Sequence, residues 1–193
     1  MVIHTIGDSH SIYGWNKELV KTHHLGGRLC FSVGRDGIDI ANGYGINNGD
    51  TVIFCFGEID CRCHVYKYLT PEMDAIQIIN DIVDKYFVSV KKAVDKFENL
   101  KTVIYNVVPP VQKHNTHENP DVPYLGTDEE RKAYVLYFNN NLKQTCGVYG
   151  FTFFDIYDKY TDTNGYLNKE LSDGVVHIRD GKYLDEFIKQ NLM

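Results

Sequence analysis

Two polar segments at opposite ends of the sequence contain residue types that together can perform acyl transfer. Gly7-Asp8-Ser9 follows an apolar run near the N-terminus, and Asp173 precedes His177 by four positions near the C-terminus. A histidine can take the proton of a serine hydroxyl, and a carboxylate can hold the imidazole in the required tautomer. The residue types therefore predict Ser9 as nucleophile, His177 as general base and Asp173 as the acid that orients it.

Short apolar runs predict the strands that position these residues. Each run has the length of a strand, and most are rich in β-branched or aromatic residues. The runs span 2–6, 29–33, 51–56, 102–108 and 151–156. Because they are almost continuously apolar, we expect strands that are buried on both faces.

Helical patterns lie between these runs. An apolar stripe follows Thr70-Pro71, a capping-box sequence opens at Thr127, and a last helix begins at about Asp180. Strands that alternate with helices predict an α/β fold, namely a three-layer α/β/α sandwich around a five-stranded parallel sheet. We expect residues 1–193 to form a single domain.

Ligands bind beyond the carboxyl ends of parallel strands, so the residues after each run are candidates for the site. Gly34 and Gly37 follow the second run, where a glycine lets a backbone N–H approach a substrate oxygen. Gly57 and Arg62 belong to a polar cluster after the third run, and Asp8 precedes Ser9. These five residues are predicted to bind the oxyanion or the substrate. The simpler alternative is that the glycines form plain turns and that Asp8 or Ser9 caps a helix.

The order of these segments resembles the SGNH (GDSL-like) hydrolase superfamily. Its members have an N-terminal Gly-Asp-Ser, a glycine after strand two, a Gly-x-Asn-Asp after strand three and a late Asp-x-x-His. The resemblance implies a flavodoxin-like SGNH fold and a Ser-His-Asp triad of Ser9, His177 and Asp173. It also implies that the N–H of Ser9 and that of Gly34 or Gly37 bind the oxyanion. No metal or organic cofactor is implied.

The sequence departs from the superfamily pattern at two places. Ile59 stands where the superfamily has an asparagine that donates to the oxyanion, and the spacing from Asp173 to His177 is one residue longer. Arg62 is the candidate replacement donor, because it carries several N–H groups on a long side chain. The alternative is a structural ion pair between Arg62 and Glu58 or Asp60.

The predicted function is a serine esterase or acylhydrolase that cleaves a small acyl ester, such as an acetyl ester, on a carbohydrate. GEIDCRCH at 57–64 looks like a branch of the superfamily that accompanies sugar-modifying genes, which implies a small-molecule or glycan ester as substrate. The polar and aromatic loop 109–126, with His114, His117 and Tyr124, also favours a sugar over a long lipid. The alternatives are a sugar O-acyltransferase with the same residues and a non-catalytic carbohydrate-binding protein.

Composition excludes several other classes of protein. The net charge is −6 and the 20 Lys and Arg residues are scattered, which argues against binding of nucleic acid. The sequence has no run of eighteen apolar residues and no signal-peptide pattern at its start, so we expect a cytoplasmic protein that does not bind a membrane.

The cysteines are odd in number, which favours reduced thiols over disulfides. Cys61, Cys63 and His64 have the side chains that zinc prefers, but no second Cys or His pair stands at zinc-finger spacing. We interpret these cysteines as small buried residues. A nucleophilic thiolate at Cys61 or Cys63, close to Arg62, is the remaining alternative.

Overall fold

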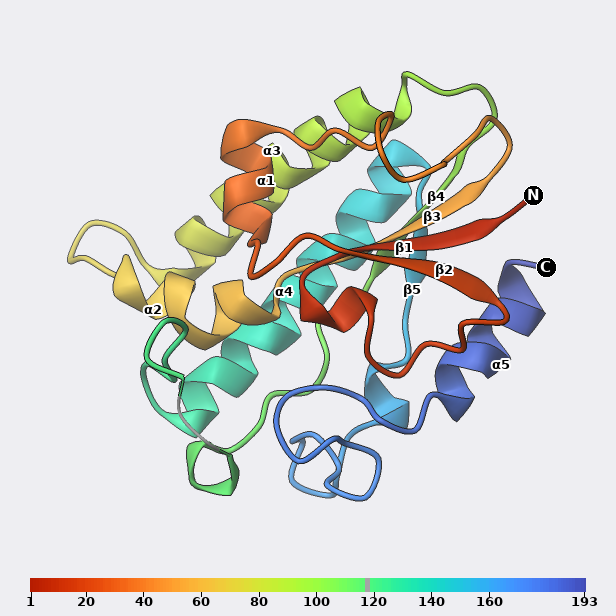
Figure 1. The fold of residues 1–193 in the computed structure, drawn as a ribbon. Coiled ribbons are helices and arrows are strands. Elements are labelled where there is room, and N and C mark those ends of the chain that lie inside the picture. Colours follow the sequence, from red (N-terminus) through yellow and green to blue (C-terminus); the bar gives the residue numbers. More distant parts are fainter. Residues whose placement is uncertain (117–118) are drawn as a thin grey trace.

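The computed structural model describes residues 1–116 and 119–193. Its sheet is parallel throughout and has the strand order β2-β1-β3-β4-β5 (Figure 1). The strands are β1 (Ile3–Gly7), β2 (Val20–His24), β3 (Thr51–Cys55), β4 (Lys101–Tyr105) and β5 (Thr152–Phe154). This order is the flavodoxin-like one. The predicted α/β class with a five-stranded parallel sheet is confirmed.

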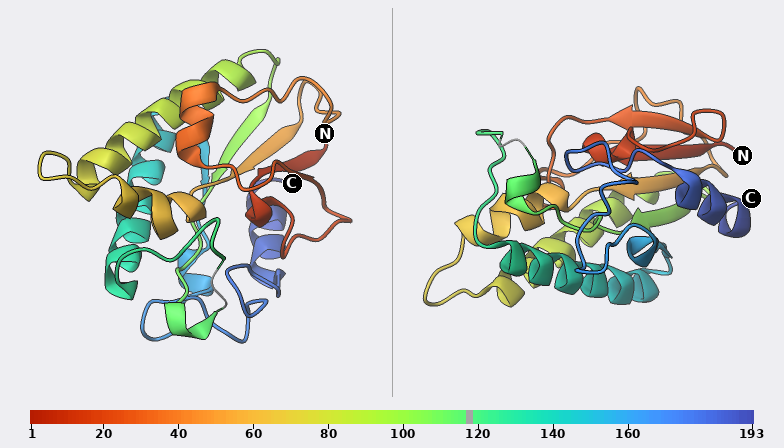
Figure 2. Two further views of the ribbon diagram at one scale, coloured as in Figure 1. Left: turned by 60° about the vertical axis from the view of Figure 1, so that its left-hand side comes forward. Right: turned by 90° about the horizontal axis from the view of Figure 1, so that it is seen from below.

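Helices cover both faces of the sheet and complete the three layers (Figure 2). The first face packs against α1 (Cys30–Asp36), α3 (Ala75–Val94) and α4 (Asp128–Tyr149), and the second face packs against α5 (Lys182–Asn191). Side chains alternate between the two faces, as the period of a strand requires. In β3, Val52 and Phe54 contact the first helix layer, whereas Ile53 contacts the second.

The predicted helices are present, with one shifted start. Thr127 and Glu130 form the expected capping box at the start of α4. The long helix α3 begins at Ala75 instead of Thr70-Pro71, because Asp74 and Gln77 form a capping box there. The described residues contain no helix with both the length and the apolar character needed to cross a membrane.

The predicted strand at 29–33 is wrong, because this segment starts helix α1. The buried Asp60 carboxylate accepts hydrogen bonds from the Cys30 N–H (2.7 Å) and the Phe31 N–H (3.0 Å). It thereby satisfies two of the N–H groups that the first turn of a helix leaves without a partner. The second strand of the chain is instead β2, an edge strand with largely polar, partly exposed residues.

Candidate active site

The turn that carries Ser9 begins where β1 comes very close to β3. A Cβ atom at Gly7 would lie 1.9 Å from the Cys55 carbonyl oxygen, so only glycine fits. The next N–H, that of Asp8, donates to the same oxygen (3.1 Å). Ser9 then opens the 3-10 turn η1 (Ser9–Ser11), and the Asp8 carboxylate caps this turn by accepting from the His10 N–H (2.8 Å). As the first N–H of the turn, that of Ser9 has no partner within it.

Ser9, His177 and Asp173 form a chain of hydrogen bonds at the carboxyl edge of the sheet. Ser9 Oγ lies 2.8 Å from His177 Nε2, and His177 Nδ1 lies 2.7 Å from Asp173 Oδ2. Because a carboxylate can only accept, Nδ1 carries a proton and Nε2 is free to accept from the hydroxyl. This is the arrangement that general-base activation of a serine requires.

The longer spacing between Asp173 and His177 is accommodated by a tight loop. Gly174 has a φ of +85°, a conformation that favours glycine. Asp173 Oδ1 accepts from the N–H groups of Val175 (2.8 Å) and His177 (3.2 Å), which leaves Oδ2 to accept from the imidazole. The carboxylate therefore holds both the loop and the ring.

Electrostatics favour the neutral imidazole and the ionised carboxylate. Burial and the nearby His10 lower the pKa of His177, although Asp173 acts in the opposite direction. Burial opposes ionisation of Asp173, but hydrogen bonds from the His177 side chain and the Val175 N–H hold the pKa of Asp173 below its ordinary value. The Tyr13 ring stacks on the His177 imidazole with centroids 4.1 Å apart. The His177 imidazole is thus held neutral, and the stacked Tyr13 ring restrains its orientation.

His10, which was not among the predicted site residues, connects the Ser9 turn to the loop that carries His177. Its Nδ1 lies 2.9 Å from Asp8 Oδ1, and its Nε2 lies 3.2 Å from the Val176 carbonyl oxygen. The imidazole is only 6% exposed. The contact to Val176 joins residues 166 positions apart, so no local sequence signal predicts it.

Gly34 and Gly37 do not lie at the end of a strand, so the predicted strand end that was the reason for placing them in the site is wrong. Gly34 is inside α1, where a Cβ atom would lie 2.8 Å from Lys85 Cβ of α3, and it therefore allows close packing of the two helices. Gly37 ends α1 with a φ of +81°. The glycines that follow the observed second strand are Gly26 and Gly27.

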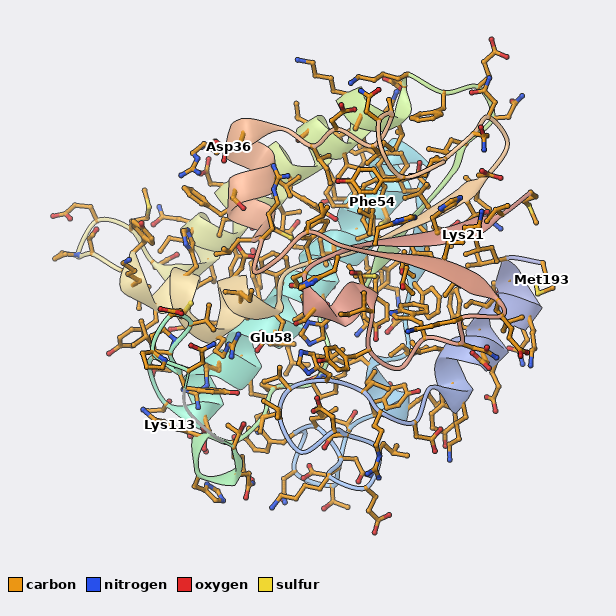
Figure 3. The ribbon with its side chains drawn as sticks, viewed as in Figure 1. Lys21, Asp36, Phe54, Glu58, Lys113 and Met193 are labelled. Atoms are coloured by element: carbon orange, nitrogen blue, oxygen red, sulfur yellow. The ribbon has the colours of Figure 1, made fainter. Side chains whose placement is uncertain are left out.

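The polar cluster after β3 is largely paired within the protein. The buried Glu58, near the middle of the molecule in Figure 3, forms an ion pair with Arg62 (3.1 Å). The Arg62 guanidinium also lies 5.2 Å from the centroid of the buried Tyr124 ring. The ion-pair alternative thus accounts for the position of Arg62, and its role as an oxyanion donor stays a prediction.

Two other residues after β3, Gly57 and Ile59, are packed against neighbouring side chains or loops. Gly57 has a φ of +113°, and a Cβ atom there would lie 2.7 Å from Val107 Cγ2. Ile59 is buried, and a Cβ atom at Gly27 would lie 3.7 Å from its Cδ1, which places the loop after β2 beside the position of the superfamily's asparagine. In the loop 109–126, His114 is exposed, and His117 lies outside the described residues.

The cysteines are protonated thiols. Burial raises the pKa of Cys63 to about 11, and burial raises that of Cys61 well above its usual range. The Cys63 thiol donates to the Ile59 carbonyl oxygen (3.3 Å). Neither sulfur is therefore a thiolate at neutral pH. Across residues 1–116 and 119–193, no three His, Cys, Asp or Glu side chains are grouped so as to hold a metal ion.

The fold, with this site at its sheet edge, is that of the SGNH (GDSL-like) hydrolases, as predicted. A protein from Streptococcus pneumonia named for platelet activating factor is similar in structure, with a TM-score of 0.71 and 17% identity over 99% of this chain and 83% of that chain. A GDSL-like lipase from Bacteroides thetaiotaomicron is also similar in structure, with a TM-score of 0.61 and 14% identity over 97% of this chain and 85% of that chain.

An acetyl xylan esterase is also similar, with a TM-score of 0.62 and 12% identity over 100% of both chains. No family model and no curated protein matches the sequence. At such identities, the similarity shows a shared fold. It leaves the reaction to be inferred from the site.

Proposed function

We propose that the protein is a serine esterase that cleaves a small acyl ester with Ser9, His177 and Asp173. The observation that carries this proposal is the unbroken hydrogen-bond chain from Asp173 Oδ2 through the His177 imidazole to Ser9 Oγ. Solved structures of the same fold include esterases and lipases, which supports the same class of reaction. Fold similarity alone does not define a function, so the proposal depends on the site.

The mechanism follows from the positions of the atoms. Ser9 Oγ attacks the ester carbonyl carbon while His177 Nε2 takes its proton, and the Asp173 carboxylate stabilises the imidazolium. His177 then donates the proton to the leaving alcohol oxygen, which yields an acyl-enzyme and free alcohol. A water molecule then attacks the acyl carbon while His177 takes its proton. The bond between the acyl carbon and Ser9 Oγ breaks, His177 returns the proton to Ser9 Oγ, and the acid is released.

The negative charge that develops on the carbonyl oxygen needs N–H donors. The Ser9 N–H is the first donor, because it opens η1 and the turn itself offers no acceptor to its first N–H. The second donor belongs in the loop after β2, at Gly26 or Gly27, in place of Gly34 or Gly37. A glycine there lets the backbone approach the oxyanion without a side chain between them.

The substrate is a small acyl group on a carbohydrate. A cavity of about 130 Å³ lies beside the Asp173 loop, lined in part by Ser172, Gly174 and Val175. Its lining also includes the apolar Val111 and Leu167. The other lining residues include Gln112, Asn115, Asp162 and Lys169, whose polar groups suit the hydroxyls of a sugar. One protein of the same fold is an acetyl xylan esterase, which supports this substrate class.

The test is turnover of p-nitrophenyl esters from acetyl to dodecanoyl by the wild type, Ser9→Ala and Ser89→Ala. We expect the acetyl ester to be preferred and Ser9→Ala to lose about 10⁴-fold or more in kcat. Ser89→Ala removes a buried hydroxyl from α3 and serves as the matched control with normal turnover. Equal turnover by the wild type and Ser9→Ala would refute the proposal, and a rate that rises steadily to dodecanoyl would refute the substrate class.

A further inference from the structure

The hydrogen-bond partners of His10 define its protonation state. Asp8 Oδ1 faces Nδ1 and the Val176 carbonyl oxygen faces Nε2. An ionised carboxylate and a carbonyl can only accept hydrogen bonds, so both ring nitrogens must donate. A neutral imidazole has a single N–H and satisfies only one of the two acceptors. Both contacts are therefore made only by the doubly protonated ring.

The geometry points to His10 as a positioning residue that is held as an imidazolium: it ties the His177 loop to the Ser9 turn and disfavours a second positive charge on His177. The two rings have centroids 5.0 Å apart. His10 bonds the carbonyl of Val176, the residue directly before His177. This inference rests on the proposed role of His177 as general base.

The charged groups around both rings agree with this assignment. His10 faces Asp8 from its own turn, Glu58 from the segment after β3 and His177 from the loop before α5. Burial opposes its charge, but Asp8, Glu58 and the Val176 carbonyl together raise the pKa of His10 above its ordinary value.

His177 faces His10 and Asp8 from the Ser9 turn and Asp173 from its own loop, and Tyr13 stacks on its ring. Glu58, which also faces His10, forms an ion pair with Arg62. Burial and the charge of His10 together lower the pKa of His177, against the pull of the two carboxylates. The consequence for catalysis is that His177 is kept neutral, and hence able to accept the Ser9 proton, into mildly acidic solution.

The test is a pH titration by NMR of the protein with isotope-labelled histidine, with signals assigned by His177→Ala and His10→Gln. In the wild type, the nitrogen shifts of His10 should be those of an imidazolium at pH 7. In His10→Gln, whose amide can still donate to Val176 but carries no charge, the His177 midpoint should rise on the order of one pH unit. The acid limb of kcat/KM should move with it.

His4→Gln is the matched control, because it also removes a buried histidine beside an aspartate, Asp50, but from the amino-terminal side of the sheet. It should leave the His177 midpoint unchanged. Neutral-imidazole shifts for His10 at pH 7 would overturn the inference. An unmoved His177 midpoint in folded His10→Gln would do the same.

If His10→Gln does not fold, the wild-type nitrogen shifts of His10, assigned through its backbone resonances, still decide whether it is an imidazolium. The titration needs no substrate, so it can fail or succeed independently of the proposed esterase activity.

Discussion

Replacing Asp173 by asparagine tests how the site chooses the tautomer of His177. Asp173 Oδ1 accepts two backbone N–H groups, those of Val175 and His177. The asparagine of Asp173→Asn has only one side-chain oxygen. This oxygen must face the N–H groups of Val175 and His177, because only an oxygen can accept from them. The amide NH₂ must then face His177 Nδ1 and donate to it. The imidazole proton is thereby forced onto Nε2, which can no longer accept the proton of Ser9.

The expected loss is about 10⁴-fold in kcat, the size seen when the corresponding aspartate of a serine protease becomes asparagine. At about 1.4 kcal/mol per factor of ten, this corresponds to roughly 5–6 kcal/mol of the activation barrier. Stability should change little, because the amide oxygen keeps both backbone hydrogen bonds. A shift in Tm of no more than a few degrees is therefore expected.

The assay is kcat for a short-chain p-nitrophenyl ester beside the melting temperature, with Asp180→Asn as the matched control. The Asp180 carboxylate accepts the Lys182 N–H (3.1 Å) near the start of α5 and is not bonded to His177. Asp180→Asn should keep near-normal turnover. If folded Asp173→Asn retains activity within about tenfold of the wild type, the tautomer argument is refuted and another group orients His177.

Three further predictions concern pH, Arg62 and Gly57. The acid limb of kcat/KM should have its midpoint below pH 6.5, because burial and His10 lower the pKa of His177. His177 becomes protonated, and can no longer accept the Ser9 proton, only as the pH falls through that lowered pKa. A midpoint above pH 6.5 contradicts this prediction. Arg62→Lys should keep kcat within about tenfold, whereas a loss of 10²–10³-fold at unchanged Tm would mean an oxyanion donor. Gly57→Ala should lower stability by about 1–3 kcal/mol, while Gly147→Ala, in open space on α4, should not; equal Tm values would exclude the close packing at Val107.

The sequence was sufficient where a local pattern coincides with the final structure. The apolar runs that became β1, β3 and β4 are the inner strands of the sheet, and their burial on both faces makes the pattern strong. The run that became the edge strand β5 was also predicted, because its aromatic residues have a strong preference for strands. The Thr127 capping box predicted the start of α4 because all of its hydrogen bonds lie within four residues.

Sequence reasoning failed where a distant residue decides the local structure. The run LCFSV at 29–33 has the composition of a strand, but its first N–H groups are bonded by Asp60, some thirty positions away, and it folds as α1. β2 was missed because an edge strand needs few apolar residues. Because the second strand was misplaced, the sequence analysis named Gly34 and Gly37 as the glycines after it, whereas the glycines after the observed β2 are Gly26 and Gly27.

In the candidate site too, residues with a local sequence pattern were predicted, and a residue whose contacts depend on the fold was not. Recognisable local patterns pointed to Ser9 and to His177, and the structure brings the two side chains into hydrogen-bond distance although they lie 168 positions apart. His10 was not found, because its contact with Val176 depends on how two loops from opposite ends of the chain meet. Its role is visible only in three dimensions.

The most direct test of the account is covalent labelling with a fluorophosphonate probe, followed by mass spectrometry of the peptides. The half-buried Ser9 hydroxyl, activated by His177, should carry the adduct, and Ser9→Ala should carry none. His177→Ala should label far more slowly, since it lacks the base. A folded wild-type protein that acquires no adduct at Ser9, under conditions in which a known serine esterase is fully labelled, would contradict the central claim.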